Sequence, residues 1–229
     1  MRKHIPNMFT LANLFMGCLA IVALWNGDPE RVFWYLLLAG FFDLLDGMLA
    51  RMLGVSGALG KQLDSLADMV SFGVVPGALA FYMMSGSEWN WLPYLGFLLT
   101  LSAAYRLGKF NIDDSQSKDF KGLATPAMAL FVATLPHIEL EGELHIIEDI
   151  LQDPMHLAGI VIILSLLMQS RMHLFSAKVD LKQWKNYIWR LLFLSISLIM
   201  ILLWAFAAAP IVLLLYLLFS IIESRRSTS

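Results

Sequence analysis

Residues 43–68 read DLLDGMLARMLGVSGALGKQLDSLAD, and apolar runs flank this stretch on both sides. An apolar run of about 20 residues is long enough to cross a bilayer as a helix. A carboxylate at the centre of such a helix costs about 2.5–3.5 kcal/mol on insertion scales, so a charge within a span indicates function. This stretch carries four carboxylates, those of Asp43, Asp46, Asp64 and Asp68.

The composition of the whole chain is that of a membrane protein. Hydrophobic residues make up 59% of the 229 residues and charged residues 15%, whereas soluble domains are about half apolar and a quarter charged. Cys18 is the only cysteine, which excludes an internal disulfide and a cysteine-based metal site. We expect one domain over residues 1–229, an all-α polytopic membrane helix bundle, and no nucleic-acid partner, because no basic patch occurs.

Apolar runs predict about eight transmembrane helices, with ends uncertain by several residues. A tetrapeptide at residues 207–210 separates the last two runs, which form either a tight hairpin or one broken helix. The predicted spans are Thr10–Trp25, Val32–Met52, Lys61–Met84, Trp91–Gly108, Leu123–Leu140, Leu157–Met172, Ile188–Ala208 and Pro210–Ile222.

The basic residues predict the orientation, because cytoplasmic loops are enriched in Lys and Arg. With eight spans and a cytoplasmic N-terminus, Arg31 alone of the 16 basic residues falls outside. Both termini and the acidic stretch then lie on the cytoplasmic side. The inner residues are Arg2, Lys3, Arg51, Lys61, Arg106, Lys109, Lys118, Lys121, Arg171, Lys178, Lys182, Lys185, Arg190, Arg225 and Arg226.

The spacing of the aspartates places them on two helix faces. Positions i, i+3, i+4 and i+7 share one face of a helix, as do positions i, i+4 and i+8. Turn-forming Gly54, Ser56 and Gly57 separate the two sets, so two antiparallel helices present two carboxylates each to a shared cleft. The first set is Asp43, Asp46, Gly47 and Ala50, and the second is Gly60, Asp64 and Asp68.

Four facing carboxylates repel one another unless cations lie between them. Oxygen ligands suit hard divalent ions such as Mg²⁺, Mn²⁺ or Ca²⁺, and paired metals are a common device of phosphoryl chemistry. A divalent-cation transporter is the alternative, since intramembrane acids can line an ion path. The acids gather at one end of two helices, which favours the enzyme.

These residues resemble a known family. The pattern D-x2-D-G-x2-A-R-x8-G-x3-D-x3-D is the signature of CDP-alcohol phosphotransferases, and every fixed position is present between Asp43 and Asp68. The resemblance implies a six-helix core with two added helices. It also implies cleavage of a CDP-linked donor, transfer of its phosphate-bearing group to an alcohol, and release of CMP.

The resemblance also implies roles for individual residues. The four aspartates would hold two divalent ions, Mg²⁺ or Mn²⁺ with Ca²⁺ as a substitute, and Asp68 would also be the general base. Sequence alone does not choose the base among the four. The donor-binding residues would be Asp46, Gly47, Ala50, Arg51 and Gly60, joined by Asn7, Thr10 and Asn13 near the N-terminus.

Further blocks resemble the bacterial phosphatidylserine synthases within that family. They are residues 5–17, 60–77 and 106–127, and together the similarity covers about residues 3–130, with Ala124 where a proline is usual. The implied substrates are CDP-diacylglycerol and L-serine at the bacterial inner membrane, and the implied assembly is a homodimer. Other acceptors, glycerol phosphate or inositol, stay open. Serine carries a carboxylate, so the candidate acceptor-binding residues are Arg106, Asn111, Lys109 and Lys121.

Overall fold

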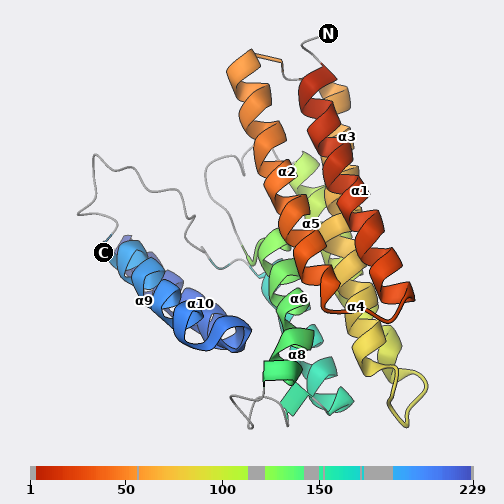
Figure 1. Cartoon of the computed structure of the whole chain (residues 1–229). Coiled ribbons are helices and arrows are strands. Elements are labelled where there is room, and N and C mark those ends of the chain that lie inside the picture. The colour runs from red at the N-terminus through yellow and green to blue at the C-terminus, as the bar shows by residue number, and fades with distance from the viewer. Residues whose placement is uncertain are drawn as a thin grey trace.

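The computed structural model describes residues 4–55, 57–112, 122–141, 150–151, 153–170, 172 and 188–227. Helices account for the regular structure of these ranges, which confirms the all-α prediction (Figure 1). The α-helices are α1 Ile5–Trp25, α2 Arg31–Leu53, α3 Ala58–Asp68, α4 Val75–Met84, α5 Phe97–Ile112, α6 Thr125–Glu141, α8 Pro154–Gln169, α9 Ile188–Trp204 and α10 Ala209–Ser227.

Three shorter elements join these helices. A π-helical turn, Met69–Val74, connects α3 to α4, so the predicted third span is one continuous helical rod with a π turn inside it. A 3-10 helix, Leu92–Gly96, leads into α5, and another, Ala205–Ala208, joins α9 to α10.

Several helices are long and apolar enough to place the chain in a membrane. Within the described residues, four stretches meet this length and composition: Ile5–Trp25, Arg31–Leu53, Ala58–Met84 and Leu192–Ser220. Two apolar helices, Thr125–Ile138 and Pro154–Gln169, are shorter. The protein is therefore an integral membrane protein.

The first three helices build the end of the bundle that carries the aspartates. α1 descends, α2 returns, and the α3–α4 rod descends again beside α1 (Figure 1). Gly54 ends α2 in the left-handed conformation, with φ of 62°, and Gly57 precedes α3 in an extended conformation. The predicted Gly-rich turn between two antiparallel helices is confirmed.

α1 packs through a narrow face of small and polar residues, which include Thr10, Asn13, Gly17 and Ala20. A Cβ atom on Gly17 would lie 2.5 Å from Ser71 Oγ and 3.1 Å from Ser71 Cα. Gly17 therefore lets α1 approach the backbone of the π turn directly. Small residues have this role at helix contacts in membranes, where close approach replaces the hydrophobic driving force.

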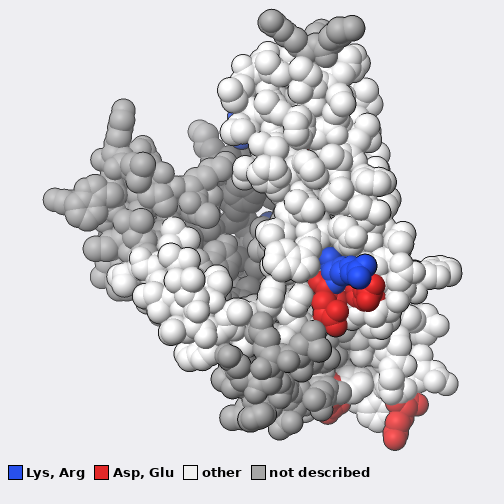
Figure 2. Space-filling model, in the orientation of Figure 1, with Lys and Arg blue, Asp and Glu red and all other residues white. Residues whose placement is uncertain are grey.

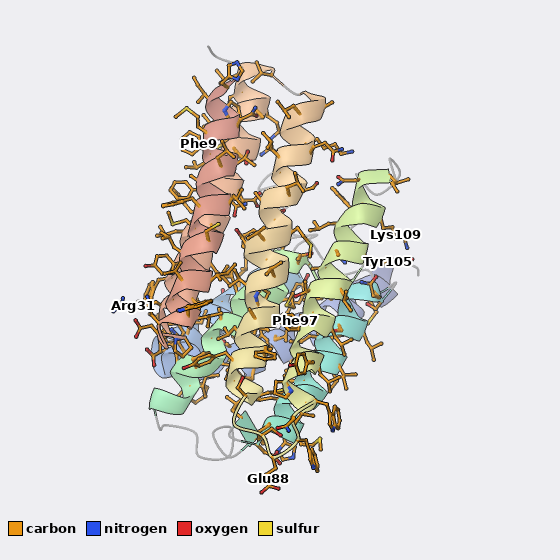
Figure 3. The ribbon with its side chains drawn as sticks, turned by 90° about the vertical axis from the view of Figure 1, so that its right-hand side faces the viewer. Phe9, Arg31, Glu88, Phe97, Tyr105 and Lys109 are labelled. Atoms are coloured by element: carbon orange, nitrogen blue, oxygen red, sulfur yellow. The ribbon has the colours of Figure 1, made fainter. Side chains whose placement is uncertain are left out.

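The far end of the bundle joins α6 to the α1–α2 loop and to the last two helices. The His137 Nε2 atom lies 2.9 Å from the Glu30 carbonyl oxygen, and the His137 ring stacks on Phe206 with ring centroids 4.0 Å apart. In Figure 3, Arg31 and Glu88 lie at the end of the molecule opposite to Phe9.

α9 and α10 form an antiparallel hairpin beside α6, so the first of the two sequence alternatives is correct (Figure 1). The ring of Phe193 near the start of α9 lies 6.1 Å from that of Phe219 near the end of α10. In Figure 2, the described part of the visible face is largely uncharged, apart from an acidic and basic group and smaller acidic patches toward the lower end.

Candidate active site

Three of the four aspartates meet between α2 and α3. One carboxylate oxygen from each of Asp43, Asp64 and Asp68 lies within 4.8 Å of the others, and the three side chains are half-buried. Asp43 comes from α2, whereas Asp64 and Asp68 come from successive turns of α3. The predicted convergence of two helix faces is correct for these three residues.

Asp46 lies beside this group and is bound to α1. Its side chain is buried, and the Thr10 hydroxyl donates a short hydrogen bond to Asp46 Oδ2. A buried carboxylate needs such donors, because an unpaired charge in an apolar interior is costly. Thr10 therefore fixes the orientation of the aspartate that stands one turn after Asp43 on α2.

A second α1 residue binds the last aspartate. Asn13 Nδ2 donates to Asp68 Oδ1 across 3.1 Å, and Asn13 is fully buried. The opposite atom of the same amide, Asn13 Oδ1, has no hydrogen-bond partner among the described residues. Thr10 and Asn13 stand three residues apart on one face of α1, so this face contacts an aspartate from each of the other two helices.

The donor set fits a hard divalent cation. Three carboxylate oxygens within one coordination sphere, with a buried amide oxygen beside them, match the all-oxygen ligands that Mg²⁺ and Mn²⁺ prefer. The salt bridges of the described residues, Arg31–Asp28 and His156–Asp153, involve none of these aspartates. Within the part of the chain that the structure describes, no salt bridge therefore offsets the mutual repulsion of these carboxylates.

The other residues of the signature lie around the carboxylates. The Arg51 side chain folds back along α2, where its Nη1 atom would stand 3.5 Å from a Cβ on Gly47. Gly60 on α3 faces α1, since a Cβ there would lie 3.4 Å from Asn7 Oδ1. Gly47, Ala50 and Gly60 are half-buried and Arg51 is exposed. Gly47 and Gly60 thus allow Arg51 and Asn7 to approach the backbone of α2 and α3.

The predicted acceptor-binding residues occupy different places. Asn111, on α5, exchanges hydrogen bonds with Ser65 of α3 at 2.8 and 3.2 Å, and its carbonyl accepts from Lys61 Nζ at 3.2 Å. Arg106 Nη1 donates to the carbonyl of Met168 at 3.0 Å. Lys109 is exposed, and in Figure 3 it projects from the side of α5. Lys121 lies outside the described residues.

The site depends on two residues that the sequence patterns did not single out. Ser71, three residues after Asp68 in the π turn, donates its hydroxyl to the Asn13 carbonyl at 3.0 Å. Thr100 of α5 donates to the Gly73 carbonyl in the same turn at 2.9 Å. A π turn departs from the α-helical hydrogen-bond pattern, and such turns are frequent at functional sites. The sequence signal that could have indicated these contacts is the pair of small residues Gly73 and Gly77 within an apolar helix.

Comparison with known proteins places this arrangement in a family. The profile of the CDP-alcohol phosphatidyltransferases matches residues 3–170, which include all four aspartates. The chain belongs to the CDP-alcohol phosphatidyltransferase family. The match runs beyond residue 130, where the resemblance seen in the sequence ended, and includes α6 and α8.

Curated relatives of this chain include proteins with two different names. The chain is 35% identical over 137 residues to the CDP-diacylglycerol–serine O-phosphatidyltransferase of Bacillus subtilis. This match covers 58% of the chain and 75% of that enzyme. It is 27% identical over 218 residues to the enzyme of the same name from Helicobacter pylori, covering 95% and 90%. An archaetidylserine synthase of Methanothermobacter thermautotrophicus is 33% identical over 134 residues, covering 57% and 56%.

Proposed function

We propose that this protein transfers the phosphatidyl group of CDP-diacylglycerol to L-serine. The serine hydroxyl oxygen attacks the phosphorus that carries the diacylglycerol, and a new P–O bond forms. The bond from this phosphorus to the bridging oxygen breaks, so CMP leaves and phosphatidylserine remains. The observation that carries the proposal is the gathering of Asp43, Asp64 and Asp68 at signature positions, in a chain whose relatives are named for this reaction.

The chain's own residues divide the work. Asp43, Asp46, Asp64 and Asp68 would hold two divalent ions, which when bound neutralise the charge that develops on the phosphate oxygens. Asp68 takes the proton from the attacking hydroxyl, which is the role that the family resemblance implies for the last aspartate of the signature. A general base must stand within hydrogen-bond reach of the proton that it removes. The donor diphosphate would lie at Gly47, Ala50, Arg51 and Gly60, with Asn7 and Thr10 on the α1 side.

The acceptor enters beside α5. Asn111 stands next to Ser65, one residue after Asp64, so it can reach a small amino acid near the cluster. Arg106 supplies the positive charge that the serine carboxylate requires, and Lys109 and Lys121 are the further candidates for this role. Arg106 also donates to Met168, which ties its guanidinium to the end of α8. This second contact orients the side chain at the entrance.

We propose that the chain is one domain over residues 1–229 and crosses the membrane about eight times, as a six-helix core with the α9–α10 hairpin added. Both termini and the acidic cluster face the cytoplasm, where CDP and serine are dissolved. The acyl chains of the donor stay in the bilayer. Two copies form a homodimer. A bacterial inner membrane is the expected location.

Release of CMP by the purified protein tests the reaction. The protein in detergent receives CDP-diacylglycerol with Mn²⁺ or Mg²⁺ and one alcohol at a time: serine, glycerol phosphate or inositol. We expect CMP with serine and phosphatidylserine as the lipid product, and no CMP after chelation of the metal. CMP with inositol alone would retain the family chemistry and overturn the acceptor. Absence of CMP with every alcohol would overturn the enzyme itself.

A further inference from the structure

Asn13 has a fully enclosed polar side chain beside the acidic cluster. Its exposed fraction is 0%, and that of its neighbour Thr10 is 3%. A buried amide is stable only when its polar atoms are paired, because each unpaired group costs about 1–3 kcal/mol. Asn13 Nδ2 is paired with Asp68, whereas Asn13 Oδ1 has no partner in the described part of the chain.

The hydrogen bond from Asn13 makes the two oxygens of Asp68 unequal. Oδ1 accepts from Nδ2 at 3.1 Å, so this oxygen is directed toward α1. The same bond restricts the rotation of the carboxylate, because one of its oxygens is held. The second oxygen, Oδ2, then has a defined direction. A carboxylate that removes a proton from a substrate benefits from such orientation, as positioned groups avoid reorganisation during the reaction.

Asn13 is itself held in place from the Asp68 side. Ser71 follows Asp68 by three residues, and its hydroxyl donates to the Asn13 carbonyl at 3.0 Å. Gly17, one turn after Asn13, allows this contact, since any Cβ there would collide with Ser71. The α3–α4 rod and α1 are therefore linked twice, once by Ser71 through the Asn13 backbone and once by Asp68 through the Asn13 side chain. Both links hold Asp68 against α1.

We propose that Asn13 is a positioning residue that holds Asp68 in the orientation required for proton removal. The sequence resemblance implied a different role, a contact with the CDP donor. The structure favours positioning, because the Asn13 side chain is fully buried and one N–H of its amide is donated to Asp68. This inference rests on the proposed function, in which Asp68 is the general base, and holds for whichever alcohol is the acceptor.

The two roles predict different kinetics for Asn13→Leu, which keeps the size of the side chain and removes its donor. Loss of positioning lowers kcat by about 10- to 100-fold, the usual effect of removing a residue that orients a functional group. The KM for CDP-diacylglycerol and the Kd for CMP stay within about twofold of wild type, because the substitution removes no contact with the bound donor. A raised KM and Kd with kcat unchanged would instead make Asn13 a donor contact and overturn the proposal.

Asn13→Ser provides a conservative comparison. Its shorter hydroxyl can still donate, so we expect kcat between those of wild type and Asn13→Leu. It also serves as the informative variant if Asn13→Leu does not fold. Ser165→Ala is the matched control, because it removes another buried polar atom that has no partner among the described residues. Its kcat should equal that of wild type. Equal kcat in all four proteins would overturn the proposal.

A double-mutant cycle with Asp68→Asn separates this inference from the reaction on which it rests. If Asn13 acts through Asp68, Asn13→Leu adds no further loss of kcat once Asp68→Asn is present, because residues that act as a unit are not additive. If Asp68→Asn is impaired and the double variant shows the product of the two single losses of kcat, only the role of Asn13 is overturned. Full turnover of Asp68→Asn would overturn the base assignment in the proposed function, and with it the positioning role.

Discussion

The acidic end of α1, α2 and α3 and the α9–α10 hairpin are both built from apolar helices, yet different contacts hold them. At the acidic end, side-chain hydrogen bonds cross between helices, as in Asn13 to Asp68 and Ser71 to the Asn13 carbonyl. In the hairpin, the packing is apolar. The Phe193 ring lies 5.8 Å from that of Tyr216 and 6.1 Å from that of Phe219, and aliphatic residues pack around these rings.

The difference teaches where this protein needs defined geometry. A directional hydrogen bond fixes both distance and orientation, whereas ring packing tolerates rotation and sliding. Leu202 on α9 is 76% exposed, and most of the neighbouring surface is apolar, so the hairpin presents itself to lipid. The hairpin also lies beyond residues 3–170, which the family profile matches. Reaction chemistry should therefore depend on the acidic end and very little on the hairpin.

Removing one carboxylate of the cluster should have the largest effect. Asp43→Asn takes away a negative ligand at the point where three oxygens converge. Charge stabilisation by metal is worth several kcal/mol, and about 1.4 kcal/mol changes a rate tenfold. We expect CMP release to fall by about 10³-fold.

The control for Asp43→Asn is Asp28→Asn, at the opposite end of α1. Its partner Arg31 lies 3.5 Å away in an exposed salt bridge, which contributes little to stability. CMP release by Asp28→Asn should match wild type. Equal losses in the two variants would mean that the acidic cluster has no special role.

Asp68→Asn should have the next largest effect, and it is specific to turnover. The amide can still accept the hydrogen bond from Asn13, but it cannot take a proton. General-base catalysis contributes about 10²–10⁴-fold, so kcat should fall by about 10²-fold or more. The KM for CDP-diacylglycerol should change little. Steady-state kinetics with each substrate varied would show whether kcat falls while the KM stays constant. Normal turnover would refute the assignment of Asp68 as the base.

Arg106→Ala should have a smaller effect that falls on the acceptor. Loss of a charge-assisted hydrogen bond costs about 1.5–3 kcal/mol, which predicts a rise of about 10-fold or more in the KM for serine. The KM for CDP-diacylglycerol should rise less. Because Arg106 also donates to Met168, a thermal-unfolding measurement should accompany the kinetics. A larger effect on the donor KM would move Arg106 to the donor site.

Phe193→Ala in the hairpin should have the smallest effect on activity. The substitution removes ring contacts with Tyr216 and Phe219, so the hairpin should lose stability by about 3 kcal/mol or less, since Phe193 is bordered partly by lipid. The kcat of folded protein in lipid nanodiscs should stay within about twofold of wild type. A loss comparable to that of Asp68→Asn would erase the distinction between the two regions.

The pattern of apolar runs and acids predicted much of the fold. α1, α2 and the rod from α3 to α4 match the first three predicted spans within a few residues, and Gly54 ends α2 as expected. The length of an apolar run and the glycines that end a helix are local properties, so they can be read directly from the sequence. The π turn at Met69–Val74 was not predictable, because it depends on contacts that Ser71 and Thr100 make with other helices.

The sequence by itself determined which residues gather at the site. Helical periodicity places Asp43 on one face of α2 and Asp64 and Asp68 on one face of α3, since it depends only on spacing along the chain. The tertiary structure decided how each carboxylate is held. Asp46 turns to Thr10, and Asp68 turns to Asn13. These pairings join residues that are far apart in the sequence. Such hydrogen bonds depend on how the helices pack, and Gly17 allows α1 to lie close to Ser71.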